Sequence, residues 1–118
     1  MKRNYELLKK MEARPAMWTG ELSLKSIRTF LDGYSFALQE HRLIKPYEEN
    51  EQNFHDWVAE KLGFDESTSG WQNMILAATL GLNTKSIKWE GYDSQVSKEQ
   101  HEKSITKFYE LLEEFINE

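Results

Sequence analysis

Residues capable of chemistry gather most densely in the polar run from Asp65 to Gly70. Its first two residues are acidic, the next three carry hydroxyl groups, and Trp71 follows the glycine directly. Carboxylates attract cations and basic proteins. The glycine and the hydroxyl groups suit anion binding instead, because the exposed backbone N–H groups at the start of a helix donate hydrogen bonds to anions. The run therefore predicts either a docking point for a basic partner or an anion-binding helix start.

A hydrolytic triad built from these residues is not supported. Ser67 or Ser69 would need His55 and Asp56 as the base and its orienting acid, but nothing in their order supports such a triad, and helix capping accounts for Ser69. The sequence also lacks a G-x-S-x-G elbow, a phosphate-binding loop, an HExxH motif and a paired-carboxylate arrangement. We predict no catalytic residue and expect a binding protein rather than an enzyme.

The charge of the chain changes sign along its length. Residues 1–47 carry nine Lys/Arg and five Asp/Glu, a net charge of +4. Residues 48–118 carry six Lys/Arg and fifteen Asp/Glu, a net charge of -9, and the two segments sum to the net charge of -5. An acidic half disfavours nucleic acid, whose phosphates need a basic surface, and favours a basic protein. Solvated helix faces would also account for the charges. The predicted partner-binding residues are Glu48, Glu49, Glu51, Asp65, Glu66, Ser67 and Thr68.

Composition predicts one folded domain over residues 1–118. The 39% hydrophobic and 13% aromatic content is typical of a globular protein rather than a disordered one. With no cysteine and three isolated histidines, we expect no disulfide, no metal site and no cofactor. No apolar run is long enough for a membrane span or a signal peptide, so a cytoplasmic protein that does not bind membranes is the simplest expectation.

Apolar residues recur at helical spacing in five segments. Ser23 is a predicted N-cap, Ser97 forms a predicted capping box with Gln100, and Ser69 forms another with Gln72. We therefore predict an all-α fold, a single-domain bundle of about five helices with ordered, aromatic-rich loops. The expected helices cover roughly residues 4–13, 23–41, 53–63, 69–81 and 97–116, with helix stops at Gly63 and Gly81.

Four residues carry further expectations about packing. Gly33 lies in the middle of a predicted helix, where glycine costs about 1 kcal/mol relative to alanine, so it predicts close packing against another element. Met17 and Trp18 are large apolar residues between helix breakers and are expected to fold back onto the core. His55 lies off the apolar stripe of its helix and is expected at the surface.

The segment RPAMWTG resembles the RPGMYIG turn that precedes the ATP-binding helix of the type II topoisomerase ATPase domain. In that family the following helix bears a catalytic glutamate and a magnesium-binding asparagine, and a GxxGxG lid motif comes later. Here the next helix reads SLKSIRTFLDGYSFAL and contains neither residue. The resemblance ends with the turn, and we expect no ATPase activity.

Four blocks together, RPAMWTG, FLDGY, FHDWVAEKLGF and STSGWQNMI, resemble an uncharacterised group of small bacterial proteins. That resemblance implies no particular activity, cofactor or site residue. Small, acidic, cysteine-free bacterial proteins are frequently immunity proteins that neutralise a toxin. By this analogy of size and charge we expect a protein-binding module, an immunity or antitoxin-like protein for a basic toxin. The alternative is a small-ligand or anion-binding helical domain that uses Ser69, Gly70 and Trp71.

Overall fold

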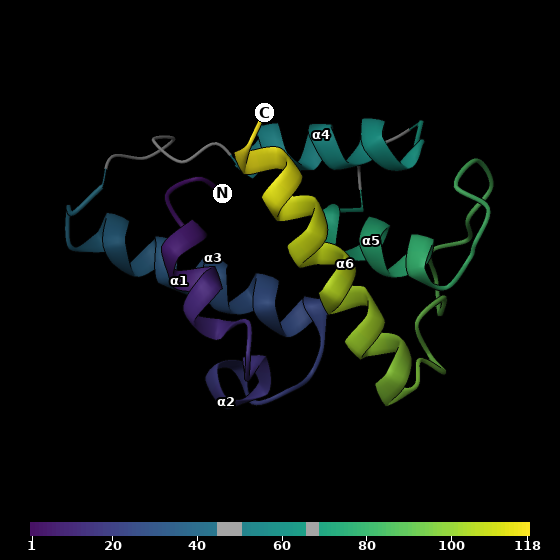
Figure 1. The fold of residues 1–118 in the computed structure, drawn as a ribbon, viewed down its shortest axis with the longest axis horizontal. Helices are drawn as coiled ribbons and strands as arrows, with labels where there is room; N and C mark the ends of the chain where they lie inside the picture. The colour runs from purple at the N-terminus through teal and green to yellow at the C-terminus, as the bar shows by residue number, and fades with distance from the viewer. Residues whose placement is uncertain (45–50, 66–68) are drawn as a thin grey trace.

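Six helices form the part of the chain that the computed structural model describes, residues 1–44, 51–65 and 69–118 (Figure 1). No strand occurs in these ranges, and the predicted all-α single-domain bundle is confirmed. None of the described helices is long and apolar enough to cross a lipid bilayer. In chain order the helices are α1 (Tyr5–Met11), α2 (Pro15–Thr19), α3 (Leu24–Glu40), α4 (Glu51–Leu62), α5 (Trp71–Thr79) and α6 (Lys98–Ile116).

The core is centred on α5, which packs against α3, α4 and α6. Trp71 at the start of α5 is fully buried. The ring of Phe108 stacks on it with centroids 4.9 Å apart, and the ring of Phe54 meets it edge-on at 5.6 Å. Such ring pairs contribute about 0.5–1.5 kcal/mol beyond the burial of their area. The start of α5 is therefore held firmly between α4 and α6.

Four helix ends follow the local chemistry that the sequence predicts. The side chain of Ser23 accepts a hydrogen bond from the backbone N–H three residues later, and Ser97 forms the full capping box with Gln100. Gly63 and Gly81 adopt φ values of +80° and +77°, which a residue without a Cβ adopts freely. In both cases the N–H of the residue after the glycine donates a hydrogen bond to the backbone carbonyl five residues before it. These are Schellman motifs, and both predicted helix stops are confirmed.

The expected loop after α1 instead forms the short helix α2. Pro15 occupies the first helical position, and Gly20 ends the helix with φ of +83°. Pro15 is buried, whereas Met17 and Trp18 are 69% and 39% exposed, so the prediction that both fold onto the core is wrong. The reason is that α2 is short and packs on α3 through one side only. Pro15 is its buried residue, so Met17 and Trp18 face away from the core.

Two other expectations about packing are also wrong. A Cβ added to Gly33 would meet no atom of the described residues within 4 Å beyond its chain neighbours and the adjacent helix backbone, and the C-terminal half of α3 extends away from α4, α5 and α6 (Figure 1). His55 is only 8% exposed. It is buried because α5 and α6 both cover α4, which widens the buried face beyond the stripe that includes Phe54 and Val58.

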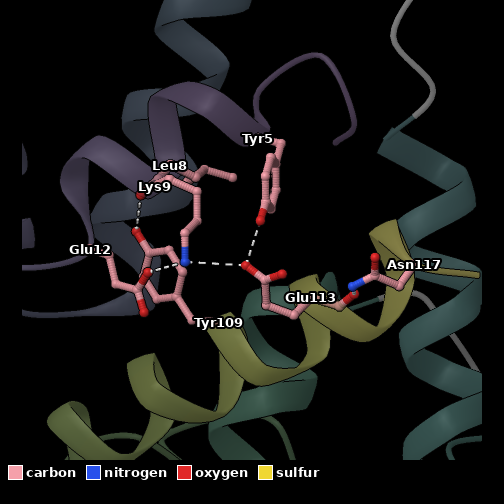
Figure 2. Close-up of polar contacts among 7 residues, drawn as sticks. All are labelled: Tyr5, Leu8, Lys9, Glu12, Tyr109, Glu113 and Asn117. Atoms are coloured by element: carbon pink, nitrogen blue, oxygen red, sulfur yellow. Dashed lines mark hydrogen bonds and ion pairs between the residues drawn. The ribbon is translucent and has the colours of Figure 1, made fainter.

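Polar contacts tie α1 to α6 across the sequence (Figure 2). The Tyr5 hydroxyl donates to Oε1 of Glu113 at 2.6 Å, and the Lys9 ammonium lies 2.6 Å from Glu12 and 3.2 Å from Glu113. The Tyr109 hydroxyl donates to a backbone carbonyl of α1 at 2.7 Å. Hydrogen bonds from Tyr5 and Lys9 lower the pKa of the Glu113 carboxyl, and burial raises the pKa of the Tyr109 phenol.

Candidate functional site

Most of the predicted partner-binding residues lie outside the described residues. Asp65 is described and exposed, and its Oδ1 lies 2.6 Å from Nζ of Lys85. An exposed pair of this kind contributes at most about 1 kcal/mol, so a cation of a partner could replace the lysine. The predicted residues outside the description, in whole or for their side chains, are Glu48, Glu49, Glu51, Glu66, Ser67 and Thr68.

The start of α5, the alternative anion site, departs from its prediction. Gly70 is the N-cap, with φ of +90° and no side-chain capping bond, and the helix begins at Trp71. The predicted capping box of Ser69 and Gln72 is wrong, because the Gln72 side chain accepts a hydrogen bond from Nη1 of Arg28 at 3.3 Å. A contact from a neighbouring helix therefore takes the place of the local cap.

The surroundings of this helix start combine a cation with a buried hydroxyl. The guanidinium of Arg28 lies over the ring of Trp71, 5.5 Å from its centroid. Trp71 is fully buried, so its ring belongs to the core and offers no open wall to a ligand. The Ser69 hydroxyl oxygen is buried and makes no hydrogen bond with any residue that the structure describes. A hydroxyl, an arginine and a helix start are chemically compatible with a small anion.

A larger feature runs along the outer side of α6. One depression of about 580 Å³ lies between α6 and the end of α5, and a second of about 310 Å³ lies between α6 and the end of α1. They share Thr106 and Glu110 and so form one continuous surface, the α6 trough. Its lining residues are Glu12, Ala78, Thr79, Glu99, Glu102, Lys103, Ile105, Thr106, Lys107, Tyr109, Glu110 and Glu113.

The α6 trough is acidic, since its lining contains five glutamates and two lysines. Nζ of Lys103 lies 3.4 Å from Glu99, a well-exposed pair that contributes little to stability. The carboxylates of Glu102 and Glu110 make no ion pair with any residue in the described ranges. Both are exposed, so they can meet a cation without breaking an existing contact.

The end of the trough next to α1 holds two further carboxylates. Glu12 and Glu113 share the ammonium of Lys9, and Tyr5 also donates to Glu113. The lowered pKa of Glu113 keeps this carboxylate charged to a more acidic pH than an unassisted glutamate. One lysine between two carboxylates leaves this end of the trough with an excess negative charge.

The floor of the trough is apolar in part. Ala78, Ile105 and Tyr109 lie among the lining residues, together with two threonines. Lysine and arginine side chains place an aliphatic stem on apolar surface and a charged head in water or on a carboxylate. An apolar floor beside exposed glutamates therefore matches basic side chains more closely than it matches a simple ion.

Sequence reasoning missed the α6 trough although one signal was available. Glu99, Glu102, Thr106, Glu110 and Glu113 follow each other at spacings of three or four, which places them on one side of α6. The negative charge of residues 48–118 indicated the sign of the surface, but not which turn or helix carries it. The pairing of that side with the ends of α1 and α5 depends on tertiary packing.

Comparison with protein-family models, with curated proteins and with solved structures finds no match for this chain. Among the described residues, no group of three or more acidic, histidine or cysteine side chains is arranged to hold a metal ion. Function is therefore inferred from the chemistry of the surfaces themselves.

Proposed function

We propose that this protein is a protein-binding module that takes a basic segment of a partner protein into the α6 trough. The observation that supports this proposal is the lining of the trough, five glutamates and two lysines around a partly apolar floor. The basic side chains of the partner lie with their stems on Ile105 and Tyr109. Their charged heads meet Glu102 and Glu110, which have no ion-pair partner among the described residues.

Charge also guides the approach of such a partner. Complementary potentials raise association rates well above those of neutral pairs, and the effect weakens as salt is added. The net charge of -5, with -9 in residues 48–118, attracts a basic protein before contact. Affinity then comes from the apolar floor and from carboxylates that lose water on binding, while the exposed rim contributes mainly to the rate.

We further propose the role of an immunity or antitoxin-like protein that neutralises a basic toxin. Support comes from the small size of 14.0 kDa, the acidic charge and the absence of cysteine, which are typical of such proteins. Neutralisation in this mechanism is occlusion: the acidic protein covers the basic surface that the toxin needs for its own target. The predicted acidic residues, of which Asp65 is described, would extend the contact beyond the trough.

The test measures binding to two probes, a lysine-rich helical peptide and any basic protein encoded beside this gene. The variant Glu102→Lys/Glu110→Lys reverses two charges in the trough. We expect at least about tenfold weaker binding to both probes, because two attractions become repulsions. We also expect the affinity of the wild type to fall as ionic strength rises, since exposed charges are screened.

The matched control is Glu60→Lys/Glu90→Lys, which changes the net charge equally at two exposed positions outside the trough. Circular dichroism checks that both variants keep the helical fold. If the control weakens binding as much as the trough variant, only net charge matters and the trough is not the site. Failure of both probes to bind the wild type would remove support for the function itself.

The second candidate function is a small-ligand or anion-binding domain that uses the start of α5. The specific support is the buried Ser69 hydroxyl without a hydrogen bond, close in sequence to the Gly70 N-cap and to Gln72, which Arg28 contacts. A thermal-shift screen with phosphate, nucleotides and small carboxylates tests it, because a bound ligand raises the melting temperature by mass action. No shift with any of these anions counts against this alternative.

A further inference from the structure

One lysine of this chain already lies on carboxylates of the α6 trough (Figure 2). Nζ of Lys9, in α1, lies 2.6 Å from Oε1 of Glu12 and 3.2 Å from Oε1 of Glu113. Both glutamates line the depression of about 310 Å³ that forms the α1 end of the trough. The structure therefore contains an ammonium group held between the two carboxylates at this end.

This contact has the chemistry that the proposed function assigns to the partner. The Lys9 side chain is 39% exposed, so neighbouring residues cover more than half of it while its charged head reaches two carboxylates. Its hydrogen bonds to Glu12 and Glu113 raise the pKa of the ammonium group, which favours the charged form. Lys9 is thus an internal counterpart of a basic side chain from a partner.

α1 is fixed to the core, whereas the head of the Lys9 side chain is held only by exposed contacts. Leu8 and Met11 are fully buried, and the Tyr109 hydroxyl donates to the backbone carbonyl of Leu8 at 2.7 Å. Exposed ion pairs contribute little to stability, and the four-carbon stem of a lysine is flexible. The ammonium group can therefore leave both carboxylates while α1 stays in place.

We propose that Lys9 is an internal ligand of the α6 trough, and that a basic side chain of the partner replaces it on Glu12 and Glu113. This inference rests on the proposed function. Two ammonium groups on one pair of carboxylates would lie close together and repel each other, so Lys9 and the partner's cation exclude each other there. Glu102 and Glu110 have no such occupant in the described ranges.

Occupation by Lys9 makes the trough selective for strongly basic segments. Contacts of a partner with Glu102 and Glu110 are added without loss, whereas contacts with Glu12 and Glu113 only replace those of Lys9. The ammonium of Lys9 is therefore a repulsive element against a partner with a few basic residues, and such elements are a common source of specificity. A segment with several basic residues compensates for the exchange through its other contacts.

The experiment measures the affinity of the full chain for the lysine-rich helical peptide at physiological ionic strength. Lys9→Met removes the ammonium group and keeps an unbranched side chain of similar helix propensity. We expect this variant to bind the peptide about threefold to fivefold more tightly than the wild type, because no exposed ion pair has to be exchanged. Circular dichroism checks that the helical fold is kept.

Lys10→Met is the matched control. Lys10 is the next residue of α1, is exposed, and makes no ion pair with any residue that the structure describes. The control changes the net charge by the same amount, so it measures how much any lost positive charge on α1 favours a basic peptide. We expect a gain of less than about twofold, since salt screens an exposed charge that holds no carboxylate of the trough.

A second comparison tests whether the effect of Lys9 passes through the two carboxylates. In the Glu12→Gln/Glu113→Gln background the lysine has no charged partner at this end, so Lys9→Met should gain no more affinity than Lys10→Met does. Equal gains for Lys9→Met and Lys10→Met in the wild-type background would overturn the proposal. So would a Lys9→Met gain that persists undiminished in the glutamine background.

Failure of this inference differs from failure of the proposed function. If the wild type binds the peptide and Glu102→Lys/Glu110→Lys weakens that binding, the proposed function is supported even where the two methionine variants are equal. If neither the wild type nor Lys9→Met binds the peptide, the proposed function and the role of Lys9 are both rejected. A Lys9→Met variant that binds where the wild type does not supports both.

Discussion

Replacing Gly33 with alanine should stabilise the folded monomer by about 0.8–1.0 kcal/mol. Gly33 lies in the interior of α3, its φ is not positive, and a Cβ there meets no atom within 4 Å. The methyl group therefore costs no packing energy and reduces the conformational freedom that the unfolded chain loses on folding. For a domain of this length, the change corresponds to a melting temperature higher by about 4 °C.

Urea unfolding at low protein concentration measures this effect on the monomer. Gly81→Ala is the matched control, because its Cβ also meets open space but its φ is +77°. The left-handed conformation costs a residue with a Cβ about 1–2 kcal/mol, so the control should lose stability. A destabilised Gly33→Ala monomer would refute the reasoning that α3 is unpacked at this point.

Three other changes test the local physics of the fold. Arg42→Gly should raise the free energy of unfolding by about 1 kcal/mol, because it relieves a left-handed φ of +59°; an unchanged urea midpoint would argue against strain there. Ser97→Ala should lower the free energy of unfolding by about 1 kcal/mol, because the capping box with Gln100 is lost; urea unfolding measures this change as well. Burial raises the pKa of Tyr109 above its usual value of 10.0. The protonated phenol therefore contributes fully to the free energy of unfolding below about pH 10, and this contribution is lost as the pH rises through the raised pKa. Stability should therefore fall above about pH 10, and less steeply in Tyr109→Phe; equal slopes for both proteins would assign the alkaline loss to other groups.

Sequence predicted the parts of the fold that local chemistry decides. Ser23, Ser97, Gly63 and Gly81 set helix ends through hydrogen bonds and φ values that depend only on neighbouring residues. The capping box at Ser69 failed because a tertiary contact, from Arg28, took the side chain that would have completed it. Local rules hold until an element distant in sequence offers a competing partner.

Burial and the site were less predictable, because residue type does not specify direction. Trp18 and Met17 are apolar, yet α2 turns them outward, and polar His55 is buried because two helices cover α4. Gly33 was expected to mark a close approach, but no element of the described ranges comes within 4 Å of a Cβ at that position. The charge count indicated an acidic surface, whereas the α6 trough exists only where α6 meets the ends of α1 and α5.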